Sequence, residues 1–112
     1  MKLFFALAIA SLASFNAHAT DDERLEACRK KLILSQKLGV LHALDWKPPK
    51  QPYIVAGRTF FDLPIDAKEG FAEALNCFLS AGATGRCLDL QILHWQTGNV
   101  AARWSGCKLK VI

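Results

Sequence analysis

The first nineteen residues most constrain how this chain folds, because they predict the compartment in which it folds. Lys2 precedes an apolar stretch, Leu3–Leu12, and Ala17–Ala19 reads Ala-His-Ala, the A-x-A pattern of a secretory cleavage site. The apolar stretch is shorter than the ~20 residues that span a bilayer. We therefore interpret Met1–Ala19 as a signal peptide, and we expect a bacterial periplasmic or secreted protein with no stable membrane insertion after cleavage.

Cleavage would leave residues 20–112, the length of a single small α+β domain. A domain of this size has a thin stability margin, because it buries only a modest fraction of its surface. The mature part contains all four cysteines: Cys28, Cys77, Cys87 and Cys107. In an oxidising compartment this even number predicts two disulfides. A metal site is disfavoured because the chain has no C-x2-C pair, and we expect no cofactor.

The charge of the chain argues against a nucleic-acid partner. The formal net charge is +4, from 14 basic and 10 acidic residues. A nucleic-acid-binding domain concentrates basic residues in a dense stripe, and this sequence has no such stripe. The expected export from the cytoplasm also argues against a nucleic-acid partner. The mild positive charge is compatible with an acidic partner in the envelope.

Apolar residues at helical spacing predict two helices. The first spans about 22–38, with acidic residues at its start and Gly39 just past its end. For the second helix, Asp66 is the expected N-cap, with Glu69 at the spacing of a capping box. Gly82 and Gly85 follow the end of this helix.

Alternating apolar residues predict two β-hairpins. In the first, Val40–Trp46 pairs with a strand over Tyr53–Phe61, in which Gly57 is a possible bulge. The turn between them, residues 47–52, holds three prolines and is therefore stiff.

The second hairpin turns at Gln96-Thr97-Gly98, with glycine in the left-handed position. The expected register pairs three sets of residues: Leu90 with Trp104, Gln91 with Arg103, and Trp95 with Asn99. The apolar parity switches after Ser105, which predicts a bulge at Gly106 and a strand that continues beyond it.

The expected architecture is αββαββ, a four-stranded antiparallel sheet with two helices on one face, stabilised by disulfides. This topology brings all four cysteines to one pole. Two connectivities satisfy it: Cys28–Cys77 with Cys87–Cys107, or Cys28–Cys107 with Cys77–Cys87. A bulge at Gly106 would turn Cys107 toward the helices, so the second connectivity is favoured.

The sheet face that the two helices leave open is the first candidate for partner binding. Tryptophan and arginine are enriched at interface hot spots, and parity places both on this face. The candidate residues there are Gln91, Leu93, Trp95 and Arg103. The second candidate is the proline-rich turn, whose stiffness lowers the entropic cost of docking. Its candidate residues are Trp46, Lys47 and Lys50.

The chain contains no recognisable catalytic constellation, since His42 and His94 follow apolar strand patterns and no serine lies in a nucleophile elbow. We therefore expect a non-enzymatic protein-binding module: an inhibitor, an immunity-type factor or an accessory factor of the bacterial envelope. Its partner would be a protein in the periplasm or outside the cell. Two alternatives stay open. One is a binder of an acidic envelope polymer through Lys47, Lys50 and Arg58, and the other is a small hydrolase that uses His42 or His94.

Overall fold

The computed structural model describes residues 20–44 and 52–112. The predicted signal peptide and most of the proline-rich turn, with Trp46, Lys47 and Lys50, lie outside the described residues. The elements follow the order α2 (Asp21–Lys37), β1 (Leu41–Ala43), β2 (Tyr53–Ala56), α3 (Arg58–Asp62), α4 (Ile65–Leu79), β3 (Leu90–His94), β4 (Val100–Ser105) and β5 (Lys108–Val111). None of the helices in this part of the chain has the length and apolar character needed to cross a membrane.

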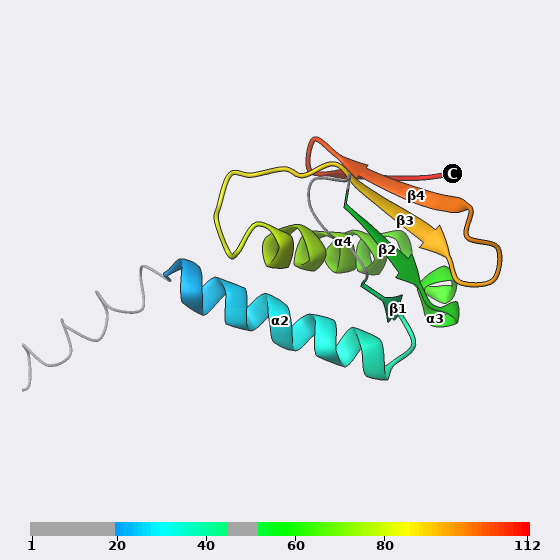
Figure 1. The fold of residues 1–112 in the computed structure, drawn as a ribbon, viewed down its shortest axis with the longest axis horizontal. Helices are drawn as coiled ribbons and strands as arrows, with labels where there is room; N and C mark the ends of the chain where they lie inside the picture. Colours follow the sequence, from blue (N-terminus) through cyan, green and yellow to red (C-terminus); the bar gives the residue numbers. More distant parts are fainter. Residues whose placement is uncertain (1–19, 45–51) are drawn as a thin grey trace, which may run out of the picture.

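The fold is α+β, with a five-stranded mixed sheet in the order β1-β2-β3-β4-β5 (Figure 1). The pairs β1–β2, β3–β4 and β4–β5 are antiparallel, whereas β2 and β3 are parallel. The prediction of a purely antiparallel four-stranded sheet is therefore wrong. The chain leaves β2, returns along α4 and enters β3 in the original direction, so that β3, lying beside β2, pairs with it in parallel.

The fifth strand arises because the chain reverses at Gly106 and Cys107 instead of forming a bulge. Both residues have positive φ, 58° and 59°, and Ser105 pairs with Lys108 across them. Two successive left-handed residues make the type I′ turn that matches the twist of a hairpin. The apolar parity switch noted in the sequence is thus the start of a new strand.

The strand predicted over Tyr53–Phe61 ends early, at Ala56, and the short helix α3 follows. The cause is a close contact with the segment between α2 and β1: the Gly57 N–H donates to the Val40 carbonyl at 2.8 Å. A Cβ on Gly57 would lie 2.1 Å from the carbonyl oxygen of Gly39. This approach ends the strand and turns Phe60 into the core, where it is almost fully buried.

The helix ends agree with the sequence in one case and differ in the other. Helix α2 matches the expected range to within one residue, and Thr20 caps it by accepting the Glu23 N–H at 3.1 Å. Helix α4 begins at Ile65 with Pro64 as its N-cap, so the prediction of Asp66 as N-cap is wrong. The Pro64 carbonyl already accepts the Lys68 N–H, which leaves Asp66 in the first turn, where its charge suits the helix dipole.

The core lies between the sheet and the two long helices, which cover the same face of the sheet (Figure 1). Alternate strand residues point into it, and the predicted inner face is confirmed at Leu90, Ile92, Ala102 and Trp104. The predicted pairs Leu90–Trp104 and Gln91–Arg103 are also confirmed. Beyond Ile92 the register shifts, and His94 donates its N–H to the Asn99 carbonyl in place of the expected Trp95–Asn99 pair.

Two disulfides stabilise the fold, Cys28–Cys77 between α2 and α4 and Cys87–Cys107 between the segment before β3 and the β4–β5 turn. This is the first of the two connectivities, so the favoured alternative is wrong: the reversal at Gly106 places Cys107 in a turn beside the start of β3. The expected gathering of the cysteines at one end is confirmed, because Asn76, next to Cys77, hydrogen-bonds to Arg86 and Leu88 on both sides of Cys87.

Candidate functional site

The strand register places four side chains in one line across the face of the sheet opposite the helices. Tyr53 pairs with Gln91, Gln91 with Arg103, and Arg103 with Lys110. We call these four residues the outer row. They come from β2, β3, β4 and β5, and the residues that alternate with them, such as Ile54 and Leu90, are buried on the helix side. The outer row is therefore held in place by the core beneath it.

The outer row changes in character along its length. Tyr53 and Gln91 are half-buried, whereas Arg103 and Lys110 are exposed. An amphipathic aromatic residue thus lies at one end and two cations lie at the other. Tyrosine and arginine are among the residues that contribute most to protein interfaces.

A depression of about 280 Å³ adjoins the outer row at the start of β3. Its polar lining comes from Asp89, Gln91, Arg103 and Ser105, and the Ser105 hydroxyl donates to Asp89 Oδ1 at 2.9 Å. This depression offers a carboxylate, an amide and a guanidinium side by side, which suits a polar segment of a partner.

The charge on this face is predominantly positive. Lys108 lies on the same side of β5 as Lys110, two residues along the strand, and Arg103 faces Lys110 across the β4–β5 pair. Asp89 is the only acidic residue between positions 86 and 112, and its Oδ1 accepts the hydrogen bond from the Ser105 hydroxyl. Like charges directly opposite each other on a sheet are unfavourable. The face therefore favours an anionic partner.

The structure separates the residues that the sequence grouped on this face. Gln91 and Arg103 are neighbours in the outer row, and Leu93 lies further along β3, between Val55 and Val100. Trp95 lies in the β3–β4 turn, where its ring stacks on that of His94 with 4.3 Å between the ring centroids. Its ring centroid is 5.6 Å from that of Phe61 in α3. The prediction that strand parity places Trp95 on the same open sheet face as Arg103 is wrong, because β3 ends at His94 and Trp95 packs against Phe61 instead.

The two histidines lie in different surroundings. His42 is exposed on β1, whereas His94 is half-buried, and its Nδ1 accepts the Gln96 N–H at 3.1 Å. The ring of His94 lies against Trp95 and Phe61. Over the described ranges, 20–44 and 52–112, there is no cluster of three or more histidine, cysteine, aspartate or glutamate residues able to hold a metal ion.

A second surface, which the sequence analysis missed, lies between α2 and α4. A groove of about 290 Å³ runs between the helices and is lined mainly by apolar residues, including Leu34, Val40, Leu63 and Phe71. Leu34 on α2 and Leu38, the C-cap of this helix, are 55% and 59% exposed. The sequence did contain a signal: Leu32, Ile33 and Leu34 are consecutive, and one buried helical stripe cannot hold all three.

The outer row depends on a polar connection that the sequence analysis also missed. Asn76 of α4 is buried and binds the segment that leads into β3. A single asparagine within an apolar helical stripe was the available signal, because a buried amide needs partners.

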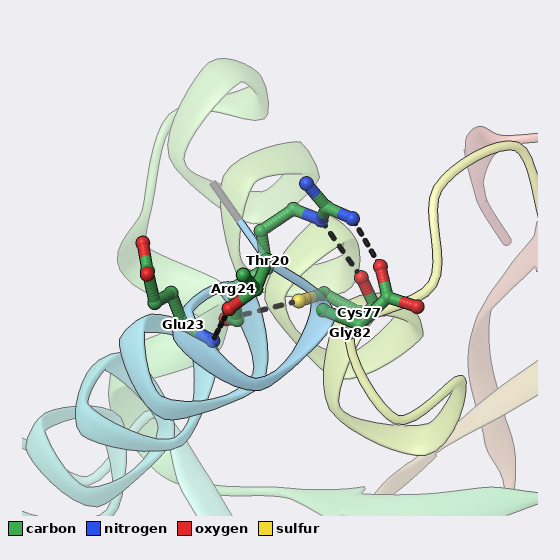
Figure 2. A network of polar contacts seen from close by, with 6 residues as sticks. Thr20, Glu23, Arg24, Cys77 and Gly82 are labelled. Atoms are coloured by element: carbon green, nitrogen blue, oxygen red, sulfur yellow. Dashed lines mark hydrogen bonds and ion pairs between the residues drawn. The ribbon is translucent and has the colours of Figure 1, made fainter. Parts of the chain in front are cut away.

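A second connection joins the start of α2 to the end of α4 (Figure 2). Arg24 donates from Nε to the Gly82 carbonyl at 2.9 Å and forms an ion pair with Asp21. Cys77 Sγ lies 3.6 Å from the Arg24 carbonyl oxygen, a contact without a hydrogen bond because a disulfide sulfur carries no proton. Together with the Cys28–Cys77 bridge, these contacts fix the helix pair beneath the sheet.

Comparison of the chain with protein-family models, with curated proteins and with solved structures finds no match.

Proposed function

We propose that this protein is an exported, non-enzymatic protein-binding module of the bacterial envelope, and that the outer row captures its partner. The observation that carries the proposal is the outer row itself: Tyr53, Gln91, Arg103 and Lys110 cross four strands on the face left open by the helices. A preorganised surface of this kind would suit an inhibitor, an immunity-type factor or an accessory subunit, because it lowers the entropic cost of binding.

The rigidity of the surface supports this proposal. Strand β3 is fixed from below by the core, and the segment before it is joined to the β4–β5 turn by Cys87–Cys107. A surface that is already ordered loses little conformational entropy when a partner binds. The two disulfides also fit an oxidising compartment, as the proposal requires.

The test is affinity capture with the oxidised mature protein, residues 20–112, from an envelope extract. The variant Gln91→Ala/Arg103→Ala removes two neighbours from the centre of the outer row. Its matched control is Lys30→Ala, which removes one exposed cation from α2. The proposal expects the double variant to lose the partner without a fall in melting temperature, while the control retains it. Undiminished capture by a folded double variant would contradict the proposal.

A second candidate function is the binding of an acidic envelope polymer. The three exposed cations Arg103, Lys108 and Lys110 favour it, because they lie on one face. Such binding weakens steeply with salt, since exposed charges are screened. The test measures binding to isolated cell-wall polymer while sodium chloride is raised from about 20 to about 300 mM. A fall in affinity supports this candidate, and an affinity that does not change with salt contradicts it.

A further inference from the structure

We propose that the partner contributes an extended segment with alternating acidic and apolar side chains, and that this segment adds as a sixth strand along the free edge of β5. This inference rests on the proposed function and specifies the chemistry of the partner. Among residues 20–44 and 52–112, strand β5 is the last strand of the sheet, so no strand of this part of the chain pairs with its outer edge.

The hydrogen-bonding pattern shows which backbone groups this edge offers. The Ile112 N–H donates to the Ala101 carbonyl at 3.0 Å, so residue 112 directs its backbone groups toward β4. Because the direction alternates along an antiparallel strand, Lys110 and Lys108 also direct theirs toward β4. Leu109 and Val111 direct their N–H and carbonyl groups to the free edge. Within the described residues, no turn, loop or side chain forms a hydrogen bond to either of them.

The side chains of β5 differ between its two faces. Lys108 and Lys110 are exposed on the outer face, whereas Leu109 packs against the core on the helix side. Val111 shares the side of Leu109 but is 47% exposed, so apolar surface stays uncovered there. An added strand would meet cations on one face and apolar surface on the other. Alternating acidic and apolar residues match this pattern, because side chains along a strand alternate between faces.

The like charges of β4 and β5 favour an acidic strand in particular. Arg103 and Lys110 are directly opposite each other, and Lys108 lies on the same face. Such a pair is destabilising in the isolated protein. Carboxylates on a neighbouring strand would convert this repulsion into attraction.

The same charges oppose a second copy of this chain as the occupant. Antiparallel pairing of two β5 edges would place the lysines of one copy beside those of the other. Lysine on an edge strand protects proteins from this kind of self-association. An oppositely charged strand does not meet this barrier.

The first experiment uses three labelled synthetic peptides. One alternates glutamate and valine, the second has lysine in place of glutamate, and the third has the composition of the first in scrambled order. Fluorescence anisotropy measures their affinity for the oxidised mature protein. The alternating acidic peptide is expected to bind at least about tenfold more tightly than the lysine or the scrambled peptide, because only its order and charge place every carboxylate on the cationic face and every valine on the apolar face. Equal affinity for the alternating acidic and scrambled peptides would overturn the inference, because it would mean that charge alone is recognised.

The second measurement locates the bound peptide. Amide hydrogen exchange by NMR should show new protection at Leu109 and Val111, and no new protection at Lys108 and Lys110, whose amides already bond to β4. Binding that leaves the exchange of Leu109 and Val111 unchanged would overturn the inference.

A matched pair of variants tests the edge itself. Val111→Pro removes an edge donor and leaves the β4–β5 bonds intact, while Val111→Ala retains the donor and removes only the two methyl groups of the side chain. The inference expects about tenfold weaker peptide binding for Val111→Pro than for Val111→Ala. Equal binding by the two contradicts the inference. If Val111→Pro retains the envelope partner and Gln91→Ala/Arg103→Ala loses it, the proposed function stands and only the added strand is refuted.

Discussion

Replacing Asn76 should weaken the fold more than its size suggests, because its side chain joins three separate parts of the molecule. Asn76 is 9% exposed, and its Oδ1 accepts the Leu88 N–H at 2.8 Å and the Trp104 Nε1–H at 3.2 Å. Its Nδ2 donates to the Arg86 carbonyl at 2.7 Å. One amide therefore ties α4 to the segment that enters β3 and to the central tryptophan of β4.

The expected loss for Asn76→Ala follows from these contacts. Three hydrogen bonds of about 1 kcal/mol each are removed. The indole N–H of Trp104, which is only 2% exposed, also loses its acceptor, and a buried donor without a partner costs ~1–3 kcal/mol. These penalties partly overlap, so we expect unfolding free energy to fall by about 3–4 kcal/mol. Domains of this class have a total stability of about 5–10 kcal/mol.

Urea unfolding of the oxidised mature protein, followed by tryptophan fluorescence, measures this loss. The control is a double-mutant cycle with Trp104→Phe, which removes the N–H that Asn76 accepts. Trp104→Phe should lower the free energy of unfolding by about 1 kcal/mol less in the Asn76→Ala background than in the parent protein. In that background the replacement removes an indole N–H that already has no acceptor. A loss below about 1 kcal/mol for Asn76→Ala, or strictly additive effects in the cycle, would refute this reasoning.

Three further stability predictions use the same urea assay. Gly82→Ala should lower the free energy of unfolding by more than about 2 kcal/mol, because Gly82 has a φ of +80° and an added Cβ would lie 2.1 Å from the Asp21 carbonyl oxygen. An unchanged free energy of unfolding would contradict this prediction. Gly70→Ala, its matched control within α4, should instead raise stability by about 1 kcal/mol, since an added Cβ meets no atom within 4 Å; a loss would contradict the open space described there. Replacing both Cys28 and Cys77 by serine should cost about 4 kcal/mol, because the bridge closes a loop with a sequence separation of 49, and a change under about 1 kcal/mol would argue against it.

Features set by neighbouring residues were predictable from the sequence. The range of α2 followed from its acidic start and from Gly39, and the pairing of Leu90 with Trp104 followed from alternation and the turn at Gly98. The presence of two disulfides followed from the cysteine count and the expected compartment. Turn chemistry, capping and side-chain periodicity act over a few residues, and a short stretch of sequence therefore contains the information.

Contacts between distant segments decided the rest. The approach of Gly57 to Gly39 ended β2 early, and the return of the chain along α4 placed β3 parallel to β2. The reversal at Cys107 then created β5, with its free edge and the Arg103–Lys110 pair. Strand adjacency depends on packing energy summed over segments far apart in the chain, which no local pattern encodes. The sequence by itself therefore determined the two long helices, the antiparallel pairing within each predicted hairpin and the number of bridges. Only the tertiary structure decided the strand order, the disulfide partners and the outer row.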